Sequence, residues 1–278
     1  MQGKTVVITG ATSGIGEVSA VALASLGARI VFVARNSGRG EAMIGRLRAA
    51  NPAAEHDWVL GDLTALAAMH AVAEALAAKA SVIDVLINNA GAIFSHREVT
   101  SDGLEKTFAV NHMAYFILTE RLRGQINPAG GRIVSTSSGA HVWGKMDFED
   151  LQSAGHYSSM AAYGRSKLAN LLWTRELARQ LEGTGVTANC LHPGGVATGF
   201  FNNNRGPLVW ILNVMKVFML TPEQGADTLT WLSSSGEVAG KSGGYWYKRK
   251  LTTPSASAQD ADLAKRLWAE SMRIAAGG

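Results

Sequence analysis

The sequence has few of the residues and segments that mark extracellular or membrane-spanning proteins. Its 278 residues include one cysteine, Cys190, so no disulfide bond can form within the chain. Cys190 lies in the apolar run 186–191, where we expect a small core residue and not a nucleophile or metal ligand. The scarcity of cysteine therefore indicates a protein of a reducing compartment.

Long apolar runs are also missing. No uninterrupted apolar stretch reaches the roughly 20 residues that a membrane-spanning helix needs. The nearest candidate, 208–220, is broken by Asn213 and Lys216; we interpret it as a flap over an apolar pocket, with a peripheral membrane contact as the alternative. The first expected strand begins almost at the N-terminus, which leaves no room for a signal peptide. These absences predict a soluble, cytoplasmic protein without a transmembrane segment.

A strong excess of one charge is absent too. Lys and Arg number 26 against 22 Asp and Glu, and the basic residues are scattered except at 248–250, where we expect a solvated loop or strand end. A nucleic-acid partner is therefore not expected. The seven histidines show no metal-ligand spacing with cysteines or acidic residues, so we predict no catalytic metal.

What the sequence does contain is a repeated alternation of short β-branched runs with Ala-rich and Leu-rich stretches. The runs predict strands at 6–9, 29–34, 58–60, 82–88, 132–136, 186–191 and 244–247. The stretches between them predict helices at 15–26, 40–50, 65–79, 104–122 and 161–182. The alternation predicts an α/β fold: a single-domain, Rossmann-type, doubly wound parallel sheet of about seven strands with helices on both faces. We expect the domain to span 1–278, with an insertion at about 193–232 and a C-terminal helix at about 255–274.

A glycine-rich turn follows the first expected strand and precedes a helix. Its glycines suit a tight turn whose backbone approaches a pyrophosphate, which would meet the free amides of the helix. The expected cofactor-binding residues in this turn are Gly10, Thr12, Ser13, Gly14, Ile15 and Gly16. The placement between strand and helix favours a dinucleotide site over the alternative, an ordinary strand–helix turn.

An arginine stands at the end of the second expected strand, where an acidic residue would bind the ribose 2′-hydroxyl of NAD. Arg35, with Asn36 and Arg39, suits a 2′-phosphate, which a carboxylate would repel. The sequence therefore predicts NADP(H), preferred over NAD(H). The alternative is a surface arginine that binds no ligand.

Two further strand ends complete the predicted cofactor site. Asp62 and Leu63, after the third strand, are expected to contact the adenine. After the fourth strand, Asn89, Ala90 and Gly91 allow the backbone to approach the other half of the cofactor. We expect both segments to belong to one dinucleotide site.

Tyr163 and Lys167 would lie one turn apart on a helix, with their side chains on the same face. A free tyrosine, with a pKa of about 10, exchanges protons poorly at neutral pH, but a fixed positive charge nearby favours its phenolate. The pair is therefore a candidate acid/base centre. Such pairs also occur on solvated helix faces, so the interpretation needs partners elsewhere in the chain.

These motifs and their order resemble the short-chain dehydrogenase/reductase superfamily over nearly the whole chain. The resemblance rests on 9–16, 88–91, Asn111, Ser138, Tyr163 with Lys167, and 193–194 followed by Thr198. Within the superfamily the chain is most similar to the retinol-dehydrogenase-like branch, in the segments 110–112, 137–141, 166–170, 244–246 and 266–268. The long interval between Ser138 and Tyr163 also resembles that branch.

The resemblance implies an NADP-dependent short-chain alcohol dehydrogenase or carbonyl reductase. Tyr163 would exchange a proton with the substrate oxygen while hydride moves at the nicotinamide. Lys167 would lower the pKa of Tyr163 and hold the nicotinamide ribose. Ser138 would orient the substrate oxygen, with Ser137 as the alternative, and Asn111 would support a water that links Lys167 to solvent.

The resemblance also implies that the loop after the sixth strand contacts the cofactor. Pro193 and Gly194 would turn the chain under the nicotinamide, and Val196 and Thr198 would meet its carboxamide and the phosphates. His192 is interpreted as a packed or cofactor-flanking residue, since the tyrosine already fills the acid/base role.

Apolar side chains follow that loop, and no basic residue stands out as a clamp for a carboxylate. The residues expected to line or cap a substrate pocket are Phe200, Phe201, Leu208, Trp210, Ile211, Met215, Phe218 and Met219. They favour an apolar aldehyde, ketone or alcohol as the substrate. The alternative function is a catalytically silent NADP(H)-binding sensor or partner-binding protein, against which the intact catalytic set argues. The resemblance further implies self-association into a homo-oligomer through the helices after Leu104 and Tyr163.

Overall fold

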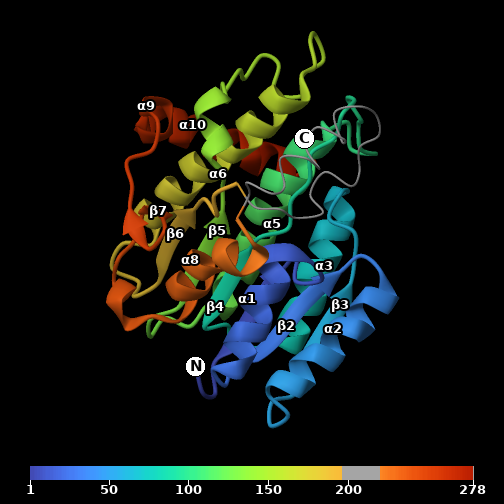
Figure 1. Cartoon of the computed structure of the whole chain (residues 1–278). Coiled ribbons are helices and arrows are strands. Elements are labelled where there is room, and N and C mark those ends of the chain that lie inside the picture. The colour runs from blue at the N-terminus through green and yellow to red at the C-terminus, as the bar shows by residue number, and fades with distance from the viewer. Residues whose placement is uncertain (196–219, 278) are drawn as a thin grey trace.

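The computed structural model describes residues 1–195 and 220–277, which are organised around one eight-stranded sheet in the order β3-β2-β1-β4-β5-β6-β7-β8 (Figure 1). The strands are β1 (Thr5–Thr9), β2 (Arg29–Ala34), β3 (Asp57–Leu60), β4 (Val85–Asn88), β5 (Arg132–Thr136), β6 (Thr187–Leu191), β7 (Tyr245–Tyr247) and β8 (Lys250–Leu251). Neighbouring strands from β3 to β7 are parallel, and β8 runs antiparallel to β7. The predicted Rossmann-type α/β fold is confirmed.

The strand order reverses beside β1, which pairs with β2 on one side and with β4 on the other. In a doubly wound sheet this reversal opens a crevice at the carboxyl ends of the central strands, where ligands bind. β1 is buried on both faces, because Val6, Val7 and Ile8 are all inaccessible to solvent. The glycine-rich turn therefore follows a buried strand and lies at the expected ligand crevice.

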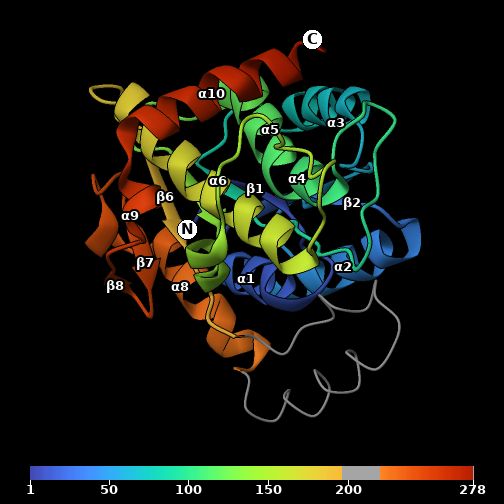
Figure 2. The ribbon, with the colours of Figure 1, turned by 90° about the horizontal axis from the view of Figure 1, so that it is seen from above.

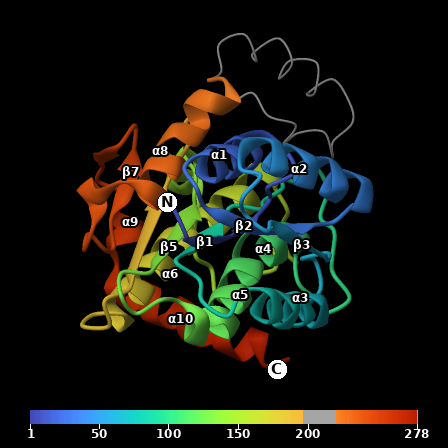
Figure 3. The same ribbon diagram turned by 90° about the horizontal axis from the view of Figure 1, so that it is seen from below.

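Within residues 1–195 and 220–277, one face of the sheet is covered by the helices α1 (Gly14–Ser25), α2 (Ser37–Ala50) and α8 (Pro222–Ser234) (Figure 3). Their apolar side chains, among them Leu23, Met43 and Leu229, form a buried cluster with Ile8 and Phe32 of the strands. Helix α8 packs on α1 and begins within the predicted insertion 193–232. The described end of that segment is thus part of a helical layer of the fold.

In the described part of the chain, the helices α3 (Leu66–Lys79), α5 (Ala114–Leu122) and α6 (Ser159–Gln180) cover the opposite face. Helix α10 (Ala261–Ala275) forms a further layer against α5 and α6 (Figure 2). The aromatic rings of Phe116 on α5 and Trp268 on α10 make an edge-to-face contact, with ring centroids 5.1 Å apart. Self-association was expected through the helices after Leu104 and Tyr163. The C-terminal helix α10 covers part of that surface within the same chain.

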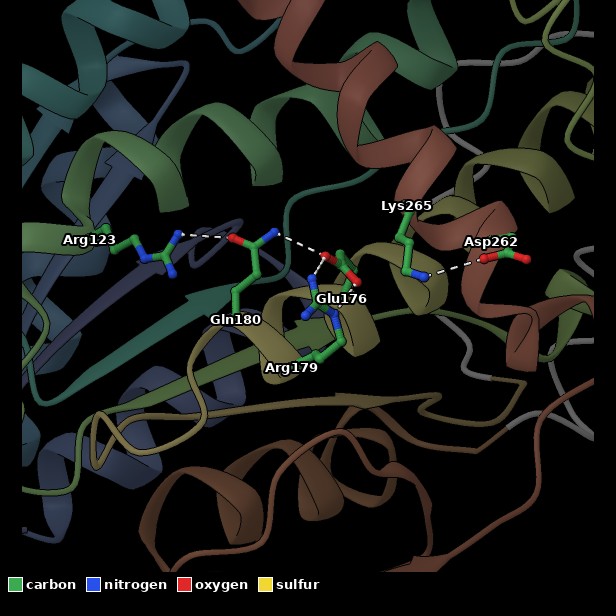
Figure 4. Close-up of polar contacts among 6 residues, drawn as sticks. All are labelled: Arg123, Glu176, Arg179, Gln180, Asp262 and Lys265. Atoms are coloured by element: carbon green, nitrogen blue, oxygen red, sulfur yellow. Dashed lines mark hydrogen bonds and ion pairs between the residues drawn. The ribbon is translucent and has the colours of Figure 1, made fainter.

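Polar contacts gather at the C-terminal end of α6 (Figure 4). The buried carboxylate of Glu176 accepts hydrogen bonds from Arg179 at 2.6 Å and from Gln180 at 3.2 Å. Gln180 in turn accepts from Arg123 at 3.4 Å, in the 3₁₀ turn η2 (Arg123–Gln125) that follows α5. These contacts connect the end of α6 to the end of α5.

The predicted helix 104–122 is not continuous. It consists of α4 (Lys106–Phe108), the π-helix η1 (Ala109–Met113) and α5. The amide of Ala114 reaches back to the carbonyl of Ala109, one residue further than in an α-helix. The wider turn re-aims the side chains of the segment that contains Asn111.

Other boundaries also differ from the prediction. The strand expected at 82–88 begins only at Val85, and Ile83 makes a single isolated bridge. The helix expected at 255–274 is interrupted at Asp260, whose carboxylate accepts from two amides of α10 and so starts a new helix after α9 (Ala256–Gln259). The two-residue strand β8 and the 3₁₀ turns η3 (Gly139–Trp143) and η6 (Gly236–Val238) were not predicted.

The basic residues 248–250 lie where β7 turns into β8, as expected for a solvated strand end. Lys248 and Arg249 have φ angles of +48° and +59°, and Arg249 forms an ion pair with Asp227. Among residues 1–195 and 220–277, no helix combines the length and apolar character needed to cross a membrane.

Candidate active site

The glycine-rich turn after β1 has no space for a side chain at two positions. The backbone of Gly10 has a φ of +71°, which side-chain-bearing residues rarely adopt. A Cβ atom on Gly10 would lie 2.8 Å from Nδ2 of Asn89, and one on Gly16 would lie 2.2 Å from the carbonyl oxygen of Gly10. The turn is therefore tight, and α1 starts close to the end of β1, as a pyrophosphate site requires.

The first turn of α1 offers amide groups at this crevice. Ser13 precedes the helix in an extended conformation and, within the described residues, its side chain does not cap the helix. The first amides of a helix have no acceptor inside it, so they suit an anion. Glu17, whose charge would oppose an anion, is paired with Arg46 of α2. The predicted residues Thr12 and Ile15 are half-buried here.

The loop after β4 is attached to the end of β1 by hydrogen bonds. The amides of Asn89 and Ala90 both donate to Oγ1 of Thr9, each at 3.0 Å. The side chain of Asn89 donates to the carbonyl oxygens of Thr9 and Gly10, at 3.2 and 3.3 Å, and accepts from Thr136 at 3.2 Å. Asn89 thereby joins the ends of β1, β4 and β5 at one side of the crevice.

The ends of β2 and β3 carry exposed charges. Arg35 and Arg39 are exposed, and Oδ1 of Asn36 accepts from the amide of Arg39 at 3.0 Å, which starts α2. In the described part of the chain neither guanidinium has a carboxylate partner, so both remain available to an anionic group. Asp62 is exposed after β3, whereas Leu63 is buried in the core beneath α3.

Tyr163 and Lys167 lie on consecutive turns of α6 and approach each other. The ammonium nitrogen of Lys167 lies 5.7 Å from the centroid of the Tyr163 ring and donates to the carbonyl oxygen of Thr136 at 3.0 Å. Burial lowers the pKa of Lys167 to about 8. Burial also raises the pKa of Tyr163 to about 12, against the smaller, opposite influence of a hydrogen bond with Ser138. At neutral pH the site therefore holds a protonated phenol beside an ammonium.

Of the two candidate serines, Ser138 is the one that lies beside Tyr163. Its hydroxyl oxygen accepts from the amide of Ala140 at 3.1 Å and makes the hydrogen bond with Tyr163. Ser137 is buried, and its hydroxyl donates to the carbonyl oxygen of Lys167 at 2.8 Å. Because successive residues of an extended segment face opposite sides, only one serine can reach the phenol.

Asn111 lies in the π-helix η1, and its side chain bridges two segments of the site. Oδ1 accepts from the amide of Ala92 at 2.8 Å, and Nδ2 donates to the carbonyl of Ala92 and to the hydroxyl of Ser166, both at 2.9 Å. A Cβ atom on Gly91 would lie 3.3 Å from Oδ1 of Asn111 and 3.5 Å from Nζ of Lys167. The structure thus brings together predicted residues of the cofactor loop and of the acid/base pair.

The loop after β6 begins with a histidine stacked on a tyrosine. The rings of His192 and Tyr247 have centroids 4.1 Å apart at 14°, and Nδ1 of His192 accepts from the amide of Gly194 at 3.1 Å. Burial lowers the pKa of His192 to about 4, so this packed residue is neutral at physiological pH. Pro193 is half-buried beside it. The predicted residues that lie outside the described residues are Val196, Thr198, Phe200, Phe201, Leu208, Trp210, Ile211, Met215, Phe218 and Met219.

Three buried polar residues close to the site, His112, His141 and Asn170, were not singled out from the sequence. Nδ1 of His141 lies 2.8 Å from the carbonyl oxygen of Ser138, and its Nε2 lies 3.1 Å from the amide of Ser255. Because that amide can only donate, Nε2 accepts and Nδ1 carries the proton. All three residues belong to segments that resemble the retinol-dehydrogenase-like branch, at 110–112, 137–141 and 166–170, and this was the signal that the sequence offered.

A sequence model of the family described as short chain dehydrogenase matches residues 4–207. The chain belongs to this family. Retinol dehydrogenase 14 of Mus musculus is 40% identical over 96% of the chain and 84% of its own length. A Streptomyces sp. (strain C5) protein named as a candidate daunorubicin C-13 ketoreductase is 39% identical over 96% of the chain and 91% of its own. The predicted family and its retinol-dehydrogenase-like branch are confirmed, and the chain is an oxidoreductase by family.

Solved structures are similar over most of the chain. An uncharacterized protein from Mycobacterium Paratuberculosis has a TM-score of 0.80 and 31% identity, covering 99% of this chain and 94% of that one. A short chain dehydrogenase from Burkholderia cenocepacia J2315, solved in complex with NADP, has a TM-score of 0.70 and 25% identity, covering 88% and 95%. Both share the fold that positions the crevice described above.

Proposed function

We propose that this short-chain dehydrogenase is an NADP(H)-dependent oxidoreductase that interconverts an apolar alcohol and its aldehyde or ketone. The observation that carries the proposal is the contact of the Tyr163 phenol with both Ser138 and Lys167. The names of the relatives, retinol dehydrogenases and a candidate ketoreductase, support the same chemistry. The enzyme would be an alcohol dehydrogenase or a carbonyl reductase, according to the direction in which it works.

The residues at the crevice fit a nicotinamide dinucleotide, which supplies or accepts the hydride when it is bound. The glycines of the β1–α1 turn let the backbone approach a pyrophosphate, and the amides of Gly14 and Ile15 would bind it. The exposed guanidinium groups of Arg35 and Arg39 would bind a 2′-phosphate. Asp62 would contact the adenine from the end of β3.

Tyr163 would act as the acid in reduction and as the base in oxidation. Its raised pKa keeps the proton on the phenol at neutral pH, ready for transfer to a carbonyl oxygen. The Ser138 hydroxyl would donate to the same oxygen and stabilise its developing negative charge. The ammonium of Lys167 would stabilise the phenolate that remains after the transfer. In oxidation the same groups would act in reverse.

Exposed apolar side chains close in sequence to Ser138 and Tyr163 support an apolar substrate. Val142 and Trp143 of η3 are 55% and 63% exposed, and Met160, at the start of α6, is 44% exposed. The turn η3 packs against α6, so these side chains lie on the turn that directly follows Ser138 and on the helix that carries Tyr163. None of the three offers a charge to a carboxylate or a phosphate. An apolar aldehyde or ketone is the substrate class that such a surface suits.

The test is NADPH oxidation by the purified protein against a panel of apolar aldehydes and ketones, with acidic and phosphorylated carbonyl compounds of similar size beside them. The same panel is run with NADH. The proposal expects turnover of apolar compounds with preference for NADPH. Much faster turnover of the charged compounds would contradict the proposed substrate class. Tight NADPH binding without turnover of any compound would instead favour a cofactor-binding sensor.

A further inference from the structure

A chain of hydrogen bonds runs from the C-terminal helix into the centre of the site. The hydroxyl of Ser271, on α10, lies 2.9 Å from Nε2 of His112. Nδ1 of His112 lies 3.3 Å from Oδ1 of Asn170, on α6. Each of these three residues is inaccessible to solvent. The row of hydrogen bonds therefore crosses a solvent-inaccessible interface between α10, η1 and α6.

The other end of this series of hydrogen bonds, at Asn170, reaches the carbonyl groups beside Lys167. Nδ2 of Asn170 donates to the carbonyl oxygen of Asn111 at 2.9 Å and, more weakly, to that of Thr136 at 3.5 Å. The carbonyl oxygen of Thr136 is also the acceptor of the Lys167 ammonium, at 3.0 Å. Asn170 and Lys167 thus share one acceptor.

Each donor and acceptor in this series of hydrogen bonds, from Ser271 through His112 to Asn170, has only one consistent assignment. Both partners of Asn170 Nδ2 are carbonyl oxygens, so this atom must donate and Oδ1 must accept. Nδ1 of His112 therefore carries the proton, and its Nε2 accepts from the Ser271 hydroxyl. Burial lowers the pKa of His112 to about 4, in agreement with a neutral ring. The orientation of the Asn170 amide is consequently fixed from both ends.

We propose that Asn170 and His112 are positioning residues for Lys167. Asn170 holds the carbonyl group of Thr136, the acceptor of Lys167, together with that of Asn111, and His112 holds the amide of Asn170. Ser271 anchors the ring of His112 to α10. The proposed reaction itself uses none of these three side chains. Only the consequence for turnover rests on the proposed function, since the state of Lys167 is measurable without a substrate.

Loss of the His112 donor frees the Asn170 amide to turn, so that Nδ2 no longer donates to the carbonyl oxygen of Thr136. That carbonyl oxygen would then be left to Lys167 alone. This change favours the ammonium, so the pKa of Lys167 would rise from about 8 toward that of a free lysine. The other titratable groups that face the ammonium are the phenols of Tyr115 and Tyr163 and the thiol of Cys190, and all stay in place.

The experiment compares two substitutions at position 112. His112→Leu removes the donor to Asn170, whereas in His112→Asn the amide nitrogen of the new side chain takes the place of Nδ1 and keeps that donor. Both lose the bond to Ser271 and the ring contacts with Phe108 and Phe116, so both are expected to lose similar thermal stability. The pKa of Lys167 is measured by NMR titration of protein with isotope-labelled lysine, without ligand, and a Lys167→Met variant assigns the signal.

We expect the pKa of Lys167 to rise by about one unit in His112→Leu and to stay near the wild-type value in His112→Asn. With an active substrate, kcat should fall in the first variant more than in the second, with KM unchanged. An unshifted pKa in His112→Leu, or equal shifts in both variants, would overturn the proposal. A wild-type protein that turns over no carbonyl compound would contradict the proposed function but would leave this titration valid.

Discussion

The carbonyl oxygen of Thr136 accepts a hydrogen bond of 3.0 Å from the ammonium of Lys167. Thr136 is the last residue of β5, and Lys167 lies one turn after Tyr163 on α6, so this bond fixes α6 to the carboxyl end of β5. The hydroxyl of Thr136 also donates to Asn89, in the loop expected to contact the cofactor. One residue therefore links the position of the ammonium to that of the cofactor loop.

The rate of reduction should fall at alkaline pH because of Lys167. The pKa of this lysine is about 8, so its charge is present below that pH and is lost as the pH rises through it. Tyr163, with a pKa of about 12, keeps its proton over the same range. Lys167→Arg should be slower at neutral pH but show no decline up to about pH 10, since an arginine stays charged. A pH profile of kcat for both proteins checks this; the same alkaline decline in the arginine variant would contradict it.

Substitution of the two serines should separate their roles. Ser138→Ala is expected to lower kcat by about 10²–10³-fold, because the substrate oxygen loses a donor where negative charge develops. Ser137→Ala removes only the bond to the carbonyl oxygen of Lys167 and should cost about 1 kcal/mol of stability, with a smaller effect on kcat. Steady-state kinetics and thermal unfolding of both variants show which serine acts in turnover and which acts in stability. A larger loss of kcat in Ser137→Ala would reverse the assignment.

The two exposed arginines after β2 should set the cofactor preference. Arg35→Ser and Arg39→Ser are each expected to raise the KM for NADPH by about 10-fold, because a charge-assisted hydrogen bond to a phosphate is lost. The KM for NADH, which has no 2′-phosphate, should hardly change. Arg48→Ser, an equal change of charge at an exposed position further along α2, is the control. Equal losses for both cofactors would show that these side chains do not recognise the 2′-phosphate.

The close approach at Gly16 should make this position intolerant of any side chain. A Cβ atom there would lie 2.2 Å from the carbonyl oxygen of Gly10, so Gly16→Ala should destabilise the protein by about 1–3 kcal/mol and weaken NADPH binding. Gly45→Ala, on the exposed side of α2 with no atom within 4 Å, should instead leave binding unchanged and raise stability slightly. Thermal unfolding and NADPH titration measure both effects. Unchanged binding in Gly16→Ala would argue against a pyrophosphate at this turn.

Much of the sheet could be predicted because its strands are short apolar runs whose side chains are buried on both faces. The strands 29–34 and 132–136 were predicted with the bounds that the structure gives. The π-helix at Ala109–Met113 could not be predicted, because its irregular turn is accompanied by bonds from Asn111 to Ala92 and Ser166, which are distant in sequence. Strand β8 is too short to have a pattern of its own.

Site residues could be predicted where a local sequence pattern determines their position. They could not be predicted where contacts between distant segments determine it. The glycines of the β1–α1 turn and the spacing of Tyr163 and Lys167 are local features, and the structure places them as expected. The choice between Ser137 and Ser138 needed the fold, because strand alternation separates the two without saying which faces Tyr163. His112 looks like one more residue of a buried helix, and only the packing of α6 and α10 gives it its partners, Asn170 and Ser271.

The central claim, that Tyr163 is the acid and base of the reaction, is tested most directly by NADPH oxidation in a Tyr163→Phe variant. The account predicts that kcat with the best apolar ketone falls by about 10²–10⁴-fold, since the proton donor is lost. The dissociation constant for NADPH, measured by titration, should stay within about twofold, because the ring and Lys167 remain. Wild-type turnover in this variant, with NADPH binding intact, would contradict the account.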